Sequence, residues 1–367
     1  MEGKRVEKAG LATAAGDIRI ATDNAVGLVT LNRPAALNAL TTGMRATIAE
    51  AFPRWARNPE VYAVVIASAT DRAFCAGGDV KETTASPRAE AVQSLAAEYS
   101  LNWLLECFTK PTVSLINGVV IGSGVGISLY GTHRVAGERY RFAMPETGIG
   151  LFPDDGVSWA FARMPDEIGM YLALTGRAIG RADAYRLGLV THCIPAARFR
   201  EIAASLSAAD TVDPLLDDRH EDPGPDELEV LRGAIARCFA ADTVEGILER
   251  LRAERGVSAT WAEGVLADLS QRSPTSLKIT HRHVGLAQEL DLRGTLAQDF
   301  RLGCRCLDGH DFYEGVRAVL IDRDQAPKWQ PARLEDVSEA MVDAYFAPLG
   351  PDELELPSRA EMQAVRA

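Results

Sequence analysis

The stretch PTVSLINGVVIGSGVGISLYGTHRVAG (Pro111–Gly137) sets the pattern of the fold. It begins with "PTVSLING", a short apolar run that is typical of a buried strand, and it ends with "HRVAG", which predicts another strand. Between them, the glycines of "GSGVGISLYGT" predict a turn that opens a short helix. A strand thus leads through a glycine-rich turn into a helix and then into a strand, which indicates an α/β fold.

The segments on either side extend this pattern. Upstream, "DIRIA" and "GLVTLNR" flank the turn "TDNAV" and predict a hairpin, and "YAVVIAS" predicts a buried strand. Helices are expected from Thr41 or Thr42 to about Arg57 and over "RAEAVQSLAAEYSLNWLLECF". Downstream, "RYRFAM" and "LVTHCI" predict strands, with helices over roughly 156–187 between them. The order is strand–strand–helix rather than a strict alternation of strands and helices.

Strand patterns nearly vanish after Arg198. The acidic, proline-bearing "DPLLDDRHEDPGPDELE" predicts an insertion or linker, and the end "PDELELPSRAEMQAVRA" is expected to be loose. Helices are expected over 226–240, 243–256, 258–272, 274–306 and about 335–347. We therefore divide the chain into a flexible N-terminal tail (1–16), a core (17–204), a variable helical insertion (205–265) and a helical C-terminal region (266–367).

The composition narrows the classes of function. The 367 residues are 47% hydrophobic and 25% charged, as in ordinary globular proteins. Lys and Arg number 39 against 51 Asp and Glu, and no basic block occurs, which argues against nucleic acid or an anionic membrane as a partner. No apolar run approaches transmembrane length, and the first residues lack the apolar stretch of a signal peptide.

Six thinly spread cysteines indicate reduced thiols, from which we expect a cytoplasmic protein. Cys304 and Cys306 are close, but no second pair of Cys or His follows at ligand spacing, so no metal site is expected.

Two glycine-rich turns and one carboxylate form the candidate site. "AFCAGGD" (73–79) and "NGVVIGSGVG" (117–126) can each present backbone N–H groups to a ligand, the second at the start of a helix. They are followed by "FAMPETGIGLFPDDG" (142–156), in which Glu146 lies among apolar residues and glycines. Two amides could stabilise negative charge on a carbonyl oxygen of the ligand, and Glu146 could act as base or nucleophile. The pattern therefore indicates acyl or enolate chemistry without a metal.

Several motifs carry a resemblance to a known family. "LNRPAALNAL", "AFCAGGD", "INGVVIGSGVG" and "FAMPETGIGLFPD" resemble, in this order, the crotonase (enoyl-CoA hydratase/isomerase) superfamily. "YLALTGRAIGRADAYRLGLVTHCI", "SPTSLKITHRHV" and "DFYEGVRAVLIDRDQAPKW" are similar to its 3-hydroxyisobutyryl-CoA hydrolase subgroup. The resemblance spans about residues 17–335 and fails over 205–265. It implies a crotonase-like spiral of strand–strand–helix turns with an extended helical C-terminal region.

The resemblance also implies roles for individual residues. The main-chain N–H groups of Gly78 and Ser123 match the oxyanion hole, although the family usually has glycine where Ser123 stands. Glu146 matches the catalytic glutamate, Asp154 the aspartate that holds the substrate's hydroxyl, and Glu98 a further acidic substrate contact. The residues expected to bind the rest of the substrate are Ala36, Leu37, Asn38, Ala76, Gly77, Asp79, Val80, Gly122 and Pro145.

One position separates hydrolases from hydratases in this superfamily. Hydratases carry a second glutamate where this chain has Gly126, which cannot transfer protons. We therefore expect a hydrolase of short 3-hydroxyacyl-CoA thioesters, acting without a cofactor, because coenzyme A is part of the substrate. An enoyl-CoA hydratase or isomerase and a non-catalytic binding protein of the same fold are the alternatives. The resemblance leaves open whether the chain forms a homo-oligomer.

Other polar residues receive structural interpretations. We expect Asp155, next to Asp154, to be a solvated turn residue, because two adjacent aspartates would not both face the ligand. His133, His192, His281 and His283 have no nucleophile at a suggestive spacing and are interpreted as structural. Cys75 lies in the first glycine-rich turn, whose amides explain that turn better than a reactive thiol does.

Overall fold

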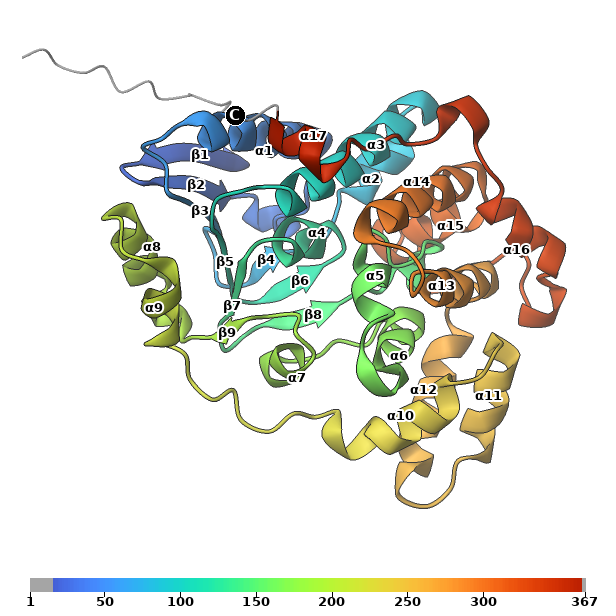
Figure 1. Ribbon diagram of the computed structural model, residues 1–367. Helices are drawn as coiled ribbons and strands as arrows, with labels where there is room; N and C mark the ends of the chain where they lie inside the picture. The colour runs from blue at the N-terminus through green and yellow to red at the C-terminus, as the bar shows by residue number, and fades with distance from the viewer. Residues whose placement is uncertain (1–15, 365–367) are drawn as a thin grey trace, which may run out of the picture.

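A computed structural model describes residues 16–364 of the chain (Figure 1). Apart from Gly16, the tail expected over residues 1–16 lies outside this range.

The larger sheet has six strands in the order β1-β2-β3-β5-β7-β9. β1 and β2 form the hairpin predicted from "DIRIA" and "GLVTLNR", and the remaining neighbours pair in parallel. Every residue of β5 is buried, as the apolar pattern predicts for a parallel strand covered on both faces. The strands are β1 (Ile18–Asp23), β2 (Val26–Leu31), β3 (Ala63–Ser68), β5 (Thr112–Ile116), β7 (His133–Ala136) and β9 (His192–Cys193).

A smaller sheet contains the parallel strands β4 (Ala73–Cys75), β6 (Val119–Ile121) and β8 (Arg141–Ala143). Of these, β4 and β6 were missed in the sequence, because three residues beside a glycine turn are too few for a periodic pattern. The chain thus places one strand in the larger sheet and the next in the smaller sheet before a helix follows. This arrangement is the predicted strand–strand–helix spiral.

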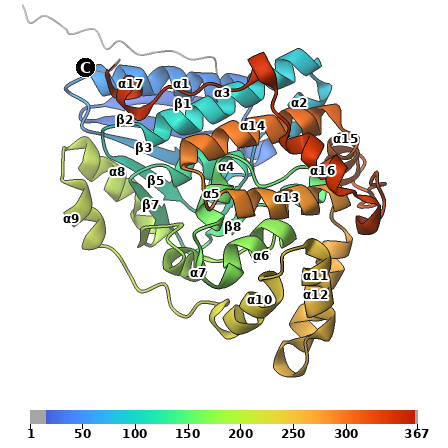
Figure 2. The ribbon, with the colours of Figure 1, turned by 45° about the vertical axis from the view of Figure 1, so that its right-hand side comes forward.

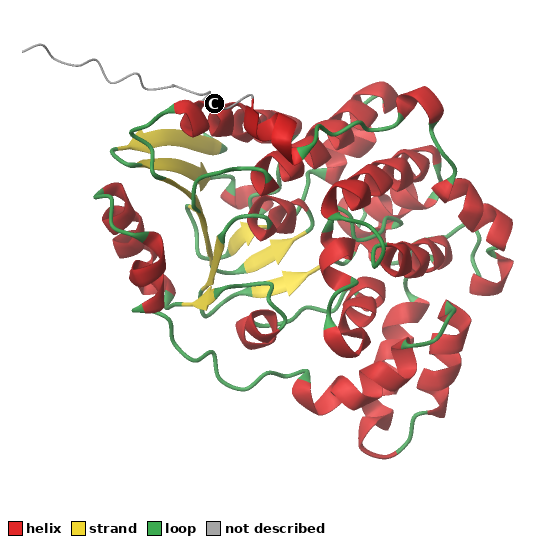
Figure 3. Ribbon diagram, viewed as in Figure 1, coloured by secondary structure: helices red, strands yellow, loops and turns green. Residues whose placement is uncertain are grey.

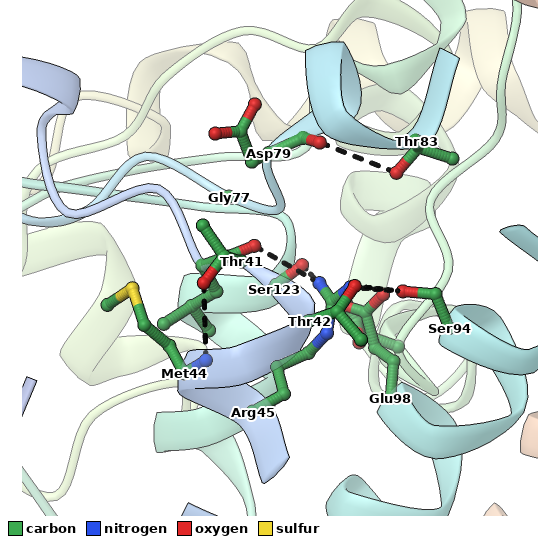
Figure 4. A network of polar contacts seen from close by, with 12 residues as sticks. Thr41, Thr42, Met44, Arg45, Gly77, Asp79, Thr83, Ser94, Glu98 and Ser123 are labelled. Atoms are coloured by element: carbon green, nitrogen blue, oxygen red, sulfur yellow. Dashed lines mark hydrogen bonds and ion pairs between the residues drawn. The ribbon is translucent and has the colours of Figure 1, made fainter. Parts of the chain in front are cut away.

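The helices of the first half connect these strands. α1 (Thr42–Arg57) begins where predicted, since the Thr41 side chain accepts a hydrogen bond from the N–H of Met44 (Figure 4). After β4 the chain forms α2 (Val80–Ala85) and then α3 (Arg88–Glu106), and after β6 it forms α4 (Ser123–Leu129). The chain then forms α5 (Val157–Phe161), α6 (Ile168–Thr175), α7 (Arg181–Arg186), α8 (Phe199–Ser207) and α9 (Val212–Asp217).

The rest of the described chain is helical, and Figure 3 shows most of these helices gathered away from the larger sheet. The helix predicted over 274–306 is two helices, because the Asp291 side chain accepts from the N–H of Gly294 and starts a new one. The helices are α10 (Arg232–Phe239), α11 (Val244–Ala253), α12 (Ala259–Ser270), α13 (Pro274–Leu286), α14 (Leu292–Asp308), α15 (Asp311–Val316), α16 (Glu339–Phe346) and α17 (Arg359–Ala364).

The end of the described chain is not loose, which corrects the expectation for residues 351–364. Trp103 Nε1 donates to the carbonyl of Pro357 at 2.7 Å, and Arg293 Nε donates to that of Leu356 at 2.8 Å. The Leu356 side chain is buried. Figures 1 and 2 accordingly show α17 lying beside α1 and α3.

The side chain of Asn38 fixes the loop that lies next to the first glycine turn. Its Nδ2 donates to the carbonyls of Ala73 and Phe74 at 3.2 and 2.9 Å, and its backbone has a φ of 60°. Two residues further on, the N–H of Leu40 donates to the carbonyl of Gly77 at 2.8 Å. The loop and the turn are therefore joined through both side-chain and backbone bonds.

We predict that Asn38→Ala lowers the free energy of unfolding by about 2–4 kcal/mol, because two buried carbonyls lose their donor and alanine is strained at a positive φ. Urea denaturation measures the change. Asn58→Ala is the control, since among the described residues that side chain bonds only to the exposed N–H of Glu60. Equal losses in the two variants would show that Asn38 does not hold the loop.

Candidate active site

A cavity of about 420 Å³ lies between the glycine-rich turns and the C-terminal helices. Most of the predicted site residues line it, namely Ala76, Gly77, Gly78, Val80, Glu98, Gly122, Ser123, Pro145, Glu146 and Asp154. Sequence reasoning missed the part of the wall that the C-terminal region contributes, including Arg272, Gly303, Leu307, Phe312, Val319, Leu320 and Gln325. Phe312, Val319, Leu320 and Gln325 lie within the motif "DFYEGVRAVLIDRDQAPKW". That motif predicts no place in the cavity, because these residues reach it only through tertiary packing.

Four predicted substrate contacts lie outside this lining. Asp79 caps α2 by accepting from the N–H of Glu82, and it pairs with Arg33 at 2.7 Å. The carbonyl of Leu37 accepts from the N–H of Ala76 at 3.0 Å, and Asn38 is fully buried. Ala36 belongs to the same loop. These residues support the Gly77–Gly78 turn, and their contact with a coenzyme A group stays a prediction.

The two glycine-rich turns lie side by side because β4 and β6 are neighbouring parallel strands. A methyl group at Gly124 would lie 2.6 Å from the carbonyl oxygen of Cys75, so only glycine permits this approach. Within residues 16–364, the N–H groups of Gly78 and Ser123 have no hydrogen-bond partner. Both residues line the cavity, as an oxyanion site requires.

Glu146 lies beside the second turn. It begins the 3₁₀ turn Glu146–Ile149 and is buried, and a methyl group at Gly122 would lie 3.1 Å from its Oε1. Its Oε2 is buried without a hydrogen-bond partner among the described residues. Burial, followed by the nearby charge of Asp154, raises the pKa of Glu146 well above its ordinary value. Such a poorly stabilised carboxylate is a stronger base and nucleophile than a solvated one.

The two adjacent aspartates face different partners. Asp154 lines the cavity, and its Oδ2 accepts from the Tyr99 hydroxyl at 2.8 Å. Burial and the nearby Glu98 and Asp299 raise the pKa of Asp154. Asp155 accepts from Asn102 Nδ2 at 2.5 Å and is only 1% exposed. The expectation of a solvated turn at Asp155 is therefore wrong, because its side chain packs against α3 instead of reaching water.

Glu98 is buried in a polar network that Figure 4 shows between α1 and α3. Its Oε1 lies 3.3 Å from Arg45 Nη1 and accepts a hydrogen bond from the Ser123 hydroxyl. Arg45 Nη2 also donates to Ser94 Oγ at 2.6 Å. The Ser123 side chain is therefore held by Glu98, and only its main-chain N–H remains available to a ligand. Sequence reasoning missed Arg45, because nothing in the pattern of α1 distinguishes this arginine from an exposed helix residue.

Gly126 has no room for a side chain. A methyl group there would lie 2.8 Å from Asp155 Oδ1 and 2.9 Å from Asn102 Oδ1. The place of a second glutamate is thus filled by the Asn102–Asp155 pair.

The remaining candidate groups have structural partners. Burial raises the pKa of the Cys75 thiol to about 12, and its Sγ donates to the carbonyl of Asn38 at 3.1 Å. Across residues 16–364, no group of three or more His, Cys, Asp or Glu is arranged to hold a metal ion. In the same range no helix has the length and apolar character needed to cross a membrane.

Comparison with known proteins shows the family of the chain. A family model described as enoyl-CoA hydratase/isomerase matches residues 26–346. A curated relative from Xenopus tropicalis, named mitochondrial 3-hydroxyisobutyryl-CoA hydrolase, is 39% identical over 93% of this chain and 91% of its own length. The human protein of that name is 38% identical with the same coverage. The chain belongs to the 3-hydroxyisobutyryl-CoA hydrolase family of the enoyl-CoA hydratase/isomerase superfamily.

Solved structures in this superfamily share the whole fold. A structure titled carnitinyl-CoA dehydratase from Mycobacterium thermoresistibile has a TM-score of 0.87 at 38% identity, covering 92% of this chain and 98% of its own. One titled enoyl-CoA hydratase from Rhodobacter sphaeroides has a TM-score of 0.86 at 36% identity, covering 93% of this chain and 100% of its own. The crotonase-like spiral is therefore confirmed.

The expected cytoplasmic location is contradicted by these comparisons. The curated relatives of the 3-hydroxyisobutyryl-CoA hydrolase family are named mitochondrial. Reduced cysteines show only that a compartment is reducing, and they do not distinguish the cytoplasm from another reducing compartment.

The raised pKa of Glu146 predicts the acid limb of activity. If the carboxylate form is active, kcat/KM should fall as the pH drops through a pKa well above the ordinary glutamate value. Asp154→Asn removes a neighbouring negative charge that raises the pKa of Glu146, so the limb should move to lower pH. The measurement is a pH profile with isobutyryl-CoA, which has no hydroxyl for Asp154 to bind. An unmoved limb would mean that another group sets it.

Proposed function

We propose that the protein hydrolyses the thioester bond of a short 3-hydroxyacyl-CoA, namely 3-hydroxyisobutyryl-CoA in valine breakdown. The observation that carries the proposal is the place of Glu146. Its carboxylate is buried beside the second glycine-rich turn, and among residues 16–364 its Oε2 has no hydrogen-bond partner. The N–H groups of Gly78 and Ser123, which line the same cavity, are unpaired within the same range.

The amides of Gly78 and Ser123 would bind the thioester oxygen. As the carbonyl carbon is attacked, negative charge develops on that oxygen, and each donor stabilises it by about 3–4 kcal/mol. Because backbone N–H groups donate, a serine can replace the usual glycine at position 123. The Ser123 hydroxyl, engaged by Glu98, stays out of the oxyanion site.

Glu146 supports two routes from this complex. In one, its carboxylate attacks the carbonyl carbon, the C–S bond breaks, and water opens the resulting anhydride. In the other, Glu146 takes a proton from a water molecule that attacks directly. A rapid acid quench followed by mass spectrometry separates them, because only the anhydride route adds the mass of the acyl group to Glu146.

Asp154 would orient the substrate. Its carboxylate accepts one hydrogen bond from Tyr99 and lines the cavity, so it can accept a second from the 3-hydroxyl group of the acyl chain. A carboxylate that is buried in this way favours substrates that supply a donor.

Two alternatives are less well supported. A hydratase needs a second proton-transferring group, and the site has no room for one at Gly126. The hydratase and dehydratase titles of the structural neighbours therefore support the fold and not that reaction. A non-catalytic binding protein would have no need for an unpaired buried carboxylate. Thiol release from 3-hydroxyisobutyryl-CoA or isobutyryl-CoA identifies a hydrolase. Loss of the double bond of an enoyl-CoA without thiol release identifies a hydratase, and a binding protein gives neither signal.

We predict that Glu146→Gln lowers kcat for thiol release by at least about a thousandfold, because the amide can neither attack nor take a proton. Coenzyme A binding, measured by calorimetry, should be unchanged. Glu50→Gln, an exposed position, is the matched control. Near-normal turnover in Glu146→Gln would place the chemistry on another residue.

A second prediction tests how the hydroxyl group is recognised. Asp154→Ala should shrink the ratio of kcat/KM for 3-hydroxyisobutyryl-CoA over isobutyryl-CoA by about ten- to hundredfold, because the plain substrate never used this acceptor. Asp71→Ala, at an exposed aspartate, is the control and should leave the ratio unchanged. If the ratio survives in Asp154→Ala, Glu98 becomes the next candidate, since Asp155 faces Asn102.

A further inference from the structure

The peptide bond between Asp155 and Gly156 is held from both sides. On one side, the carbonyl of Asp155 accepts a hydrogen bond from the Tyr130 hydroxyl. On the other, the N–H of Gly156 donates to Asp299 Oδ2 at 2.6 Å. Tyr130 follows α4 and Asp299 lies in α14, so one peptide joins the core to the C-terminal region.

The backbone at this peptide needs such support. Both Asp155 and Gly156 adopt left-handed conformations, with φ values of 57° and 73°. Few residues other than glycine adopt this region, although aspartate does so more readily than most. Two successive left-handed residues turn the chain sharply directly after Asp154.

This turn decides which aspartate faces the substrate. Asp154 lies toward Tyr99 and the cavity, whereas Asp155 lies toward Asn102. If these two bonds were lost, the left-handed torsions of Asp155 and Gly156 would no longer be fixed, and the loop that carries Asp154 would relax with them. The cavity would then lose the acceptor for the substrate's hydroxyl group.

Asp299 is an unusual residue to find here. It is fully buried, its Oδ1 lies 2.6 Å from His283 Nε2, and it lies near Asp154 and Asp155, which carry the same charge. Burial raises its pKa. A buried carboxylate near two others is unfavourable unless its hydrogen bonds compensate. The hydrogen bond from the N–H of Gly156 links Asp299 directly to the loop that carries Asp154.

His283 extends the support to the start of the same loop. The ring of Phe152 meets the His283 ring edge to face, with 5.5 Å between their centroids. Phe152 and Gly156 are therefore both held by the Asp299–His283 pair. His283 is therefore a structural residue, as expected, and its contacts with Asp299 and Phe152 connect it to the site.

We propose that Asp299 is a positioning residue for thioester hydrolysis. By accepting the N–H of Gly156, it fixes the turn in which Asp154, and not Asp155, faces the substrate's 3-hydroxyl group. This inference rests on the proposed function. It adds a residue of α14 to those that determine which substrate is recognised.

Three variants test this role through substrate selectivity. Asp299→Leu removes the acceptor at similar size, Asp299→Asn keeps an oxygen for Gly156, and Tyr130→Phe releases the opposite side of the peptide. The control is Asp183→Asn, because Asp183 is also buried and accepts a backbone N–H, from Leu228 at 2.9 Å, but lies outside the cavity lining. The measurement is kcat/KM for 3-hydroxyisobutyryl-CoA and isobutyryl-CoA, with the melting temperature of each variant.

We expect the ratio of the two kcat/KM values to fall about tenfold in Asp299→Leu and about threefold in Tyr130→Phe, and to recover to within about twofold in Asp299→Asn. Asp183→Asn should lower the melting temperature without changing the ratio. A purely structural role for Asp299 would slow both substrates equally and leave the ratio intact, and that result overturns the inference.

The outcomes also separate this inference from the proposed function. If the wild-type protein favours the hydroxylated thioester but Asp299→Leu and Tyr130→Phe keep the full ratio, only the role of Asp299 is overturned. If Asp299→Leu does not fold, Tyr130→Phe decides, because phenylalanine fills the space of the tyrosine ring. If the wild-type protein releases no thiol from either compound, the proposed function fails, and the inference fails with it.

Discussion

Burial of negative charge is the constraint that shapes this molecule. Glu98, Glu146, Asp154 and Asp155 all lie in or beside one largely apolar cavity, where a carboxylate loses the hydration that stabilises its charge. Protein groups replace this hydration at three of the four. Arg45 pairs with Glu98, Tyr99 donates to Asp154, and Asn102 donates to Asp155. In the part of the chain that the structure describes, Glu146 Oε2 has no partner, and it lies next to the turn that carries the unpaired N–H of Ser123. The least stabilised carboxylate is thus the one placed beside the groups that would stabilise an attacked carbonyl.

The fold brings these groups together through a small number of close approaches. Parallel pairing of β4 with β6 sets the two glycine-rich turns side by side, and the missing side chain at Gly124 lets α4 come close to the first turn. α3 then supplies Glu98, Tyr99 and Asn102 from one helix face, because residues four apart in a helix are neighbours. Each polar partner of the buried carboxylates therefore comes from a rigid element, and only the carboxylates of the 142–156 stretch lie in turns.

The sequence carried the parts of the site that depend on local chemistry. Glycine turns and a carboxylate among apolar residues can be recognised in a few letters, so the residues alone indicate the two glycine-rich turns and Glu146. The choice of Gly78 and Ser123 within those turns comes from the family resemblance. Arg45, Tyr99 and Asp299 could not be identified, because each acts through a contact with a residue dozens of positions away. Only one of the two adjacent aspartates lines the cavity, as expected, but Asp155 does not face water, because it is buried against Asn102. The short strands β4 and β6 were not predicted for a similar reason, since their pairing is visible only in three dimensions.

The wide spread of the cavity wall has a consequence for how the protein is made. Lining residues run from Ala76 to Gln325, and the loop of Asp154 is bonded to α14, so the cavity closes only when nearly the whole chain is present. During synthesis, the apolar wall from the first half would be exposed to water until the C-terminal helices emerge and pack against it. Contacts between distant parts of a chain form slowly, and intermediates with exposed apolar surface are prone to aggregate. The nascent chain therefore exposes the apolar wall around Glu146 before the C-terminal helices cover it, and at that stage association with neighbouring chains is favoured.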